Sequence, residues 1–237
     1  MKIQDFFDSI YIVNLIERKD RRDQIVKELE KINIYLTPGK VELFSAVKPT
    51  EAKGFETSGT RGCFLSHLEI LKIAQEKGLS NILVIEDDLM ISEKFLDVQD
   101  RLMNQLQCSD WGFVYFGHIE NLSGDTFCQL QSYPAAKGIQ TSHFYGINST
   151  VFNPLISFMD SLQERAPADP LGGPMHLDGA YSFFRANNPK ILTLISCPNL
   201  GSQRSSRSDV HELKWFDKVK IFRPILAFLR NIKTSLF

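Results

Sequence analysis

The segment from Ser80 to Asp88 places a run of apolar residues directly before three acids, in the order Ser-Asn-Ile-Leu-Val-Ile-Glu-Asp-Asp. Residues 82–85 are apolar and mostly branched, which is typical of a strand buried on both faces of a parallel sheet. Unpaired charges are very costly in a protein core, so the acids must lie beyond the carboxyl end of this strand. In an open α/β sheet, that end is the edge at which ligands bind.

Glu86, Asp87 and Asp88 would therefore bring hard oxygen ligands to one edge of the sheet. Such ligands suit Mg²⁺ or Mn²⁺ that carries a phosphate. Acids also mark the ordinary end of a strand and the start of a solvated loop. Taken alone, the pattern fits both interpretations.

Strand and helix patterns alternate through the first half of the chain. The expected strands are 10–14, 41–47, 82–85 and 111–116, and the expected helices are 20–32, 61–77 and 92–106. Asp20 is the expected cap of the first helix, and Gly78 ends the second. This alternation predicts an α/β fold with a mostly parallel sheet and helices on both faces.

The second half of the chain is less regular. The expected elements are a strand at 143–152, a helix at 155–165, a loop rich in Pro and Gly at 166–174, a short helix at 178–185 and a last strand at 191–196. We expect residues 1–210 to form the globular domain and residues 211–237 to form a basic, amphipathic tail.

The composition limits the class of protein. With 237 residues, of which 43% are hydrophobic and 23% charged, the chain is long enough for a full core. Its formal net charge of −1 gives no reason to expect a nucleic acid as partner. No pair of cysteines has metal-ligand or redox spacing, which favours reduced thiols. The N-terminus does not resemble a signal peptide, and no segment approaches the ~20 apolar residues of a membrane span, so we expect a cytoplasmic protein.

The turn after the first strand is rich in arginine. From Asn14 to Arg22 it reads Asn-Leu-Ile-Glu-Arg-Lys-Asp-Arg-Arg. The helix dipole disfavours cations at a helix N-terminus, and an anionic ligand at the same edge would explain Arg18, Arg21 and Arg22. A solvated turn, in which Asp20 and Asp23 balance the arginines, fits the same residues.

The helix at 61–77 begins with Arg-Gly-Cys-Phe-Leu-Ser-His. Helical spacing places His67 beside the apolar face, where it is either a core histidine bonded to a neighbour or a ligand contact. Ser66 would cap the helix or bond to a helix carbonyl. Arg61 and Gly62, at the amino end, would allow a phosphate to approach.

Two later segments carry further candidates. Asp178 lies near the start of a short helix, where it is either an N-cap or a general base presented into a cleft. The segment 203–209 includes Arg204 and is either a flexible loop or a lid over phosphates.

These motifs follow one another in a set order. The order is Asn14-Leu-x-x-Arg18-x-Asp-Arg21-Arg22, Gly62-Cys-x-x-Ser66-His67, Ile85-Glu86-Asp87-Asp88, His143-x-Tyr145, Asp178 and Ser208-Asp209. As a set, they resemble glycosyltransferase family 25, over about residues 9–210. This family contains the bacterial galactosyltransferases of lipopolysaccharide and lipooligosaccharide biosynthesis, and the collagen galactosyltransferase domains are relatives.

The resemblance implies a GT-A-like, Rossmann-type fold and inverting transfer from a UDP-sugar, typically UDP-galactose, to a hydroxyl of a lipid-linked oligosaccharide. Asp88 would hold Mn²⁺ (or Mg²⁺), with Glu86 assisting directly or through water. Asp178 would be the general base. The residues implied for donor binding are Asn14, Arg18, Arg61, His67, Asp87 and Arg204. The Glu at the first position departs from a strict Asp-x-Asp pattern, which leaves the metal requirement open.

The tail from Lys214 onward combines basic residues with apolar residues at helical spacing. The apolar positions are Trp215, Val219, Phe222, Leu226 and Leu229. This pattern suits an interfacial segment on an anionic membrane, where a lipid-linked acceptor would be found, and it equally suits a helix packed on the domain. Pro224 would break or kink the helix.

Two other functions remain open at this point. The chain could be a transferase that uses another UDP-sugar or a protein acceptor, because one or two hydrogen bonds decide which sugar a pocket accepts. It could also be a non-catalytic glycan-binding protein of the same fold.

Overall fold

The structure is a computed structural model that describes residues 1–120, 122 and 129–204. These residues belong to one compact unit. The predicted domain boundary at residue 210 and the predicted tail, 211–237, lie outside the described residues. Among the helices of the described part, none is both long enough and apolar enough to cross a bilayer.

Helices and strands largely alternate in the first half of the chain, as the sequence predicts. The helices are α1 (Ile3–Phe6), α2 (Lys19–Lys31), α3 (Ser58–Glu76), α4 (Phe95–Gln107), α5 (Ser149–Glu164) and α6 (Leu177–Asn187). The strands are β1 (Ser9–Asn14), β2 (Val41–Ser45), β3 (Asn81–Glu86), β4 (Leu89–Ile91), β5 (Trp111–Tyr115), β6 (Gln129–Ser132), β7 (Phe144–Asn148), β8 (Leu192–Cys197) and β9 (Gly201–Gln203).

A seven-stranded sheet, in the order β2-β1-β3-β7-β5-β8-β6, forms the centre of the described part. β1 pairs in parallel with β2 and β3, and β5 pairs in parallel with β8. β7 is antiparallel to both of its neighbours, and β6 is antiparallel to β8. All strands except β6 and β7 therefore run in one direction, and the predicted mostly parallel sheet is confirmed.

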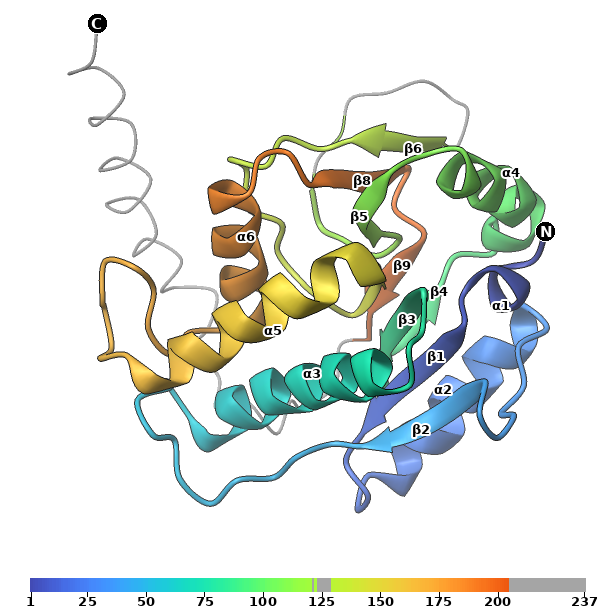
Figure 1. Ribbon diagram of the computed structural model, residues 1–237. Helices are drawn as coiled ribbons and strands as arrows, with labels where there is room; N and C mark the ends of the chain where they lie inside the picture. The colour runs from blue at the N-terminus through green and yellow to red at the C-terminus, as the bar shows by residue number, and fades with distance from the viewer. Residues whose placement is uncertain (121, 123–128, 205–237) are drawn as a thin grey trace, which may run out of the picture. The chain divides into compact units, whose positions relative to one another are not determined.

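Helices cover both faces of this sheet, so the predicted α/β fold class is confirmed (Figure 1). Strand β3 shows why two layers are needed. Its Leu83 and Ile85 belong to the cluster that contains residues of α1, α2 and α4, such as Ile25. Its Ile82 and Val84 belong to the cluster that contains residues of α3, α5 and α6. Side chains alternate along a strand, so β3 is buried on both faces, as its unbroken apolar run predicts.

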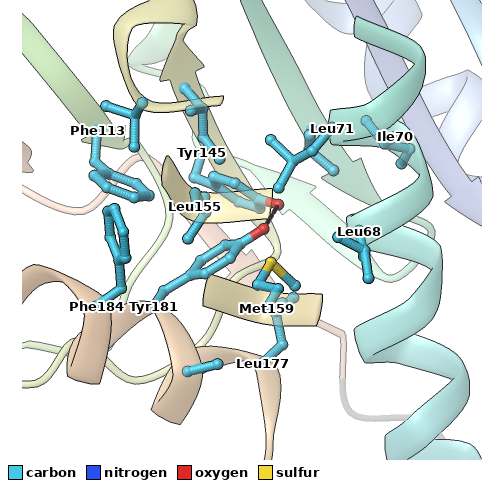
Figure 2. Packing of buried hydrophobic residues seen from close by; sticks show 14 of the residues in the cluster. Leu68, Ile70, Leu71, Phe113, Tyr145, Leu155, Met159, Leu177, Tyr181 and Phe184 are labelled. Carbon is cyan, nitrogen blue, oxygen red and sulfur yellow. Dashed lines mark hydrogen bonds between the residues drawn. The ribbon is translucent and has the colours of Figure 1, made fainter. Parts of the chain in front are cut away.

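The second of these clusters has a polar centre (Figure 2). Tyr145 of β7 and Tyr181 of α6 point toward each other, and their hydroxyl oxygens are 3.1 Å apart. Leu68 and Leu71 of α3 line the same space. Because a buried hydroxyl without a partner is costly, this pairing allows two phenols to lie inside an apolar core.

Helix α3 is held against the segment that follows β2. Thr57 caps the helix by accepting the backbone N–H of Thr60 at 2.9 Å. Ser66 donates its hydroxyl to the carbonyl of Gly62 at 2.7 Å and accepts the backbone N–H of Val47 at 2.8 Å. The prediction that Ser66 bonds to a helix carbonyl is therefore confirmed. Gly62 permits this contact, because a Cβ built there would lie 2.5 Å from the carbonyl oxygen of Val47.

Strands β4 and β9 form a separate, two-stranded antiparallel sheet beside the acids. Leu89 pairs with Gln203, and Ile91 pairs with Gly201. The backbone N–H of Arg204 then donates to the carbonyl of Asp88 at 2.7 Å. The start of the predicted loop at 203–209 is thus the end of a strand, and residues 205–209 lie outside the described part of the chain.

Several predicted boundaries are wrong for local reasons. The predicted strand at 143–152 ends at Asn148, whose side chain accepts the backbone N–H of Thr150 at 3.1 Å and caps α5. Asp20 is not the cap of α2, because Arg18 occupies the N-cap position and Asp20 forms an ion pair with it at 2.9 Å. Strands β4, β6 and β9 were not predicted, because three or four residues carry too little periodicity.

We predict that Gly62→Ala destabilises the fold, although alanine favours helix more than glycine does by up to ~1 kcal/mol. The new methyl group would overlap a backbone oxygen that cannot rotate away. We expect a net loss of about 1–3 kcal/mol in the free energy of unfolding, measured by urea denaturation. Gly179→Ala is the matched control, because its nearest atoms lie 3.6 Å away in the flexible Met175 side chain. Equal stability of the two variants would contradict the prediction.

Candidate functional site

Asp87 is the acid that is tied most firmly into the fold. It is 7% exposed, and its two carboxylate oxygens accept hydrogen bonds from Asn14 at 2.7 Å and from Arg21 at 3.0 Å. Asn14 ends β1 and Arg21 lies in α2, so one carboxylate joins two parallel strands and a helix. Burial raises the pKa of Asp87, and the bonds from Asn14 and Arg21 oppose that shift.

Asp88 is the acid with the fewest compensating contacts. Arg21 lies 3.8 Å from its Oδ2 atom, and its buried Oδ1 atom has no hydrogen-bond partner in the described structure. Burial and the neighbouring charge of Glu86 raise the pKa of Asp88 to about 7, although Arg21 acts in the opposite direction. The Asp88 carboxyl therefore binds a proton readily, and a cation in that place would relieve the same repulsion.

Glu86 ends β3 and faces helix α3. Its Oε1 atom lies 3.8 Å from the thiol of Cys63 and 3.6 Å from Nε2 of His67, and its Oε2 atom accepts the side-chain amide of Gln203 at 3.2 Å. The distance to His67 is longer than a hydrogen bond, so that attraction is electrostatic. Burial opposes ionisation of Glu86, but His67, His143 and Gln203 outweigh it, and the pKa of Glu86 is lowered.

The chemistry of these acids fits a divalent cation. Three successive carboxylates lie at the carboxyl end of a parallel strand, and one of them keeps a buried oxygen without a partner in the described structure. Carboxylate oxygens are the ligands that Mn²⁺ and Mg²⁺ prefer. The predicted assignment of Asp88 and Glu86 to the metal stays a prediction, because their side chains meet different neighbours: Arg21 for Asp88, and α3 and β9 for Glu86.

The sequence left open whether His67 is a core histidine bonded to a neighbour or a ligand contact, and its two ring nitrogens have different surroundings. Its side chain is 0% exposed, and Nδ1 lies 2.6 Å from the hydroxyl of Tyr145, which in turn contacts Tyr181. Its Nε2 atom points toward Glu86 and has no hydrogen-bond partner among the residues that the structure describes. His67 is thus a core histidine satisfied on one side, and its other nitrogen faces the acidic edge.

Cys63 lies one helical turn before His67, and the sequence analysis did not include it in the site. Burial raises the pKa of the Cys63 thiol well above its usual value, and the charges of Glu86 and Asp178 raise it further. The ligand atoms of Cys63, His67 and Glu86 all lie within 4.8 Å of one another. The helical spacing of Cys63 and His67, four residues apart on one face, is visible in the sequence, but the approach of Glu86 from β3 is not.

Asp178 lies in the first turn of α6, where His176 occupies the N-cap position. Asp178 accepts the N–H of Gly179 at 2.8 Å and that of Thr141 at 3.4 Å. Its charge also acts on Cys63. The residue is therefore on the side of the sheet that carries α3, and its role as general base stays a prediction.

The three arginines predicted for donor binding have other contacts in this structure. Arg18 binds Asp20, and Arg61 donates to the carbonyl of Glu51 at 2.9 Å. Arg204 binds Gln24 and lies 3.2 Å from Glu28 of α2. Their donor roles stay predictions.

Two residues beside the acids were absent from the predicted site. Arg21 contacts both Asp87 and Asp88, and Gln203 contacts Glu86. Arg21 belongs to the arginine-rich turn that the sequence analysis identified. The sequence did not show that Arg21 is the arginine of this turn that pairs with Asp87 and Asp88. Gln203 reaches the site through the pairing of β9 with β4, which no local pattern indicates.

Comparison with known proteins finds a family match for part of the chain. Residues 54–127 match the family described as glycosyltransferase family 25 (LPS biosynthesis protein). Human procollagen galactosyltransferase 2 is 30% identical over 136 residues, which cover 47% of this chain and 21% of that protein. The human inactive glycosyltransferase 25 family member 3 is 28% identical over 129 residues, which cover 47% of this chain and 22% of that protein.

The chain thus spans about a fifth of the length of the curated relatives it matches. Among solved structures, a glycosyltransferase involved in the glycosylation of the major capsid of PBCV-1 is similar, with a TM-score of 0.40 and 12% identity. That similarity covers 78% of this chain and 91% of that one. The matched residues 54–127 contain both the Gly62-to-His67 motif and the three acids, and the predicted resemblance to glycosyltransferase family 25 is confirmed.

Proposed function

We propose that this chain is an inverting, metal-dependent β-galactosyltransferase that moves galactose from UDP-galactose to a hydroxyl of a lipooligosaccharide or lipopolysaccharide glycan. The observation that carries the proposal is the acidic edge, Glu86 to Asp88, which lies inside the segment that matches family 25 and is contacted by Arg21. The family's description as an LPS biosynthesis protein supports the acceptor, and the galactosyltransferase relatives support the sugar.

The acidic edge serves the departure of the diphosphate. A bound Mn²⁺ or Mg²⁺ supplies the charge that neutralises the leaving UDP. Asp88, assisted by Glu86, holds that cation, and Arg21 adds a fixed positive charge beside it. The bond between Asn14 and Asp87 keeps this edge rigid, so its charges need little reorganisation during transfer.

The remaining donor contacts require side chains to change partners. Arg18, Arg61 and His67 line the donor pocket in this proposal, and Arg204 closes over the phosphates. Arg204 contacts α2 in the present structure, so it must leave Glu28 to reach a donor. Binding energy from the donor's phosphates would offset that exchange of partners.

Asp178 accepts the proton of the acceptor hydroxyl. As the hydroxyl oxygen forms its bond to the anomeric carbon, the bond from that carbon to UDP breaks on the opposite face, which inverts the configuration. The proton passes to the Asp178 carboxylate, whose orientation is fixed by the N–H of Gly179.

The place of action follows from the acceptor. We propose a cytoplasmic protein, peripheral on the inner face of the cytoplasmic membrane, where a lipid-linked oligosaccharide is presented. The basic, amphipathic segment 211–237 would contact the anionic surface. The chain needs no nucleic acid for this function.

One alternative has an observation of its own. Some relatives carry the word inactive in their names, among them the human family member 3. A non-catalytic glycan-binding protein of this fold would keep the acidic edge without turnover. A second alternative is a transferase that uses another UDP-sugar or a protein acceptor, and the name of the procollagen relatives supports the protein acceptor. Such an enzyme would keep both the acidic edge and the turnover.

We predict that Asp88→Asn abolishes transfer without harming the fold. The folded state raises the pKa of Asp88 to about 7, so the free energy of unfolding falls as the pH rises from the unfolded pKa to about 7, and that loss remains at higher pH. Removing the charge should therefore leave the melting temperature equal or higher at pH 7. We expect kcat/KM to fall at least ~100-fold in an assay of UDP release with Mn²⁺.

Asp97→Asn is the control for this variant, because Asp97 is an exposed residue in the first turn of α4. It should retain full activity. An Asp88→Asn variant as active as this control would remove Asp88 from the proposed metal site.

We predict that UDP binds the purified chain in the presence of Mn²⁺ and that a chelator abolishes the binding. The reason is that the arginines near this edge already form ion pairs with carboxylates of the chain itself. The negatively charged diphosphate therefore needs a bound cation to offset the repulsion from the nearby acids. Isothermal titration calorimetry measures this directly. Binding that persists with chelator would keep a nucleotide site but remove the cation from it.

We predict that Asp178→Asn lowers kcat by ~100-fold or more while the affinity for UDP stays unchanged, because the base acts on the acceptor and not on the donor. UDP titration and steady-state kinetics separate the two effects. Asp110→Asn, at an exposed position before β5, is the control. Weaker UDP binding with normal kcat would place Asp178 in the donor pocket instead.

A further inference from the structure

Three potential ligand atoms from two elements converge next to the acidic edge. They are Sγ of Cys63, Nε2 of His67 and Oε1 of Glu86, all within 4.8 Å of one another. Oε1 of Glu86 is 3.8 Å from the sulfur and 3.6 Å from the imidazole nitrogen. Helix α3 supplies the first two from successive turns, and the end of β3 supplies the third.

These separations are close to those of a tetrahedral zinc site. Bonds of about 2.0–2.3 Å at tetrahedral angles place neighbouring ligand atoms roughly 3.3–3.6 Å apart. The oxygen–nitrogen distance of 3.6 Å lies at the upper end of that range, and the sulfur–oxygen distance of 3.8 Å lies just above it. We propose that Cys63, His67 and Glu86 bind one soft divalent cation, Zn²⁺ by ligand chemistry, at a second site that shares Glu86 with the hard-cation site proposed for Asp88.

A second observation points to the same place. Nε2 of His67 is buried and aimed at Glu86, and within the described part of the chain it has no hydrogen-bond partner. A buried polar nitrogen normally has a partner, and a cation would supply it. Thiolate and imidazole ligands select Zn²⁺ over Mg²⁺ or Mn²⁺.

The surroundings of His67 suit a metal ligand. A histidine that binds a cation through Nε2 carries its proton on Nδ1 and donates it to a neighbour, which fixes the ring. Here Nδ1 is 2.6 Å from the hydroxyl oxygen of Tyr145. That oxygen can accept a hydrogen bond from Nδ1–H, while the Tyr145 O–H donates a hydrogen bond to the hydroxyl oxygen of Tyr181, 3.1 Å away. Tyr145 is therefore a positioning residue for this site.

Binding at this site exchanges a proton for the cation. Without a cation, the Cys63 thiol donates to Oε1 of Glu86. When the cation binds, a sulfur–metal bond replaces the sulfur–hydrogen bond, one proton goes to solvent, and no oxidation occurs. Three protein ligands leave a fourth tetrahedral position open. The side chain of Glu86 is 22% exposed, which gives that position access to solvent.

This inference does not rest on the proposed transferase activity. Glu86 presents Oε1 to Cys63 and His67, while its Oε2 atom is held by Gln203. The test therefore omits donor and acceptor. Purified full-length protein, reduced and freed of metal, is titrated with Co²⁺, and the thiolate-to-cobalt absorption band is recorded. The stoichiometry of Zn²⁺ is then measured after dialysis.

We expect one equivalent of metal per chain and a thiolate band that disappears in Cys63→Ser. His67→Gln and Glu86→Gln should each weaken Co²⁺ binding at least ~10-fold, and Tyr145→Phe should weaken it by ~10–100-fold. Cys108→Ser, which changes an exposed thiol, should keep the band, and so should Asp88→Asn. Circular dichroism checks that each variant is folded.

Two results would overturn the proposal. One is a wild-type protein that shows no thiolate band and retains no zinc, in which case the three residues form only a hydrogen-bonded cluster. The other is a band of equal strength in a folded Cys63→Ser variant, which would assign the metal to another thiol. A chain that binds zinc but transfers no sugar keeps this inference and removes the proposed function.

Discussion

The carboxylate of Asp87 holds the functional edge together. It accepts hydrogen bonds from Asn14 at 2.7 Å and from Arg21 at 3.0 Å, and these two donors compensate a charge that burial alone would disfavour. The bonds fix the turn between β1 and α2 against the end of β3. Glu86 and Asp88, on either side of Asp87, then face different partners. Glu86 faces Cys63 and His67 of α3, and Asp88 faces Arg21 of α2.

The sequence predicted the parts of the fold whose signals are local. The apolar run at 82–85 identified β3 and the position of the acids, because burial on both faces and the cost of buried charge act within a few residues. It did not predict that β7 runs antiparallel between β3 and β5, since strand direction is decided by the path of the chain between elements. The early end of β7 at Asn148 depended on a single capping side chain.

The sequence identified some residues of the candidate site and missed others, because a sequence shows local spacing but not which segments meet. Motif order singled out the acids and His67, and the structure places one of the acids, Glu86, 3.6 Å from Nε2 of His67. The sequence could not distinguish the arginines of one turn: in the structure Arg18 pairs with Asp20, and Arg21 pairs with Asp87 and Asp88. Cys63 was overlooked because a thiol and an imidazole on one helix face become a pair of ligands only when a third group approaches them.

The pairing of β4 with β9 means that the acidic edge is completed late in folding. Gln203 is 117 residues beyond Glu86 in the sequence, and Arg204 is 176 residues beyond Glu28. Contacts this distant form slowly, because the ends of a long loop must first meet. During synthesis the N-terminal half leaves the ribosome first, so β1, β3 and α3 can assemble while the acids are still uncovered. A nascent chain that stops before Gly201 would therefore lack β9, the strand that pairs with β4. Its acids would be exposed to solvent and would bind cations nonspecifically.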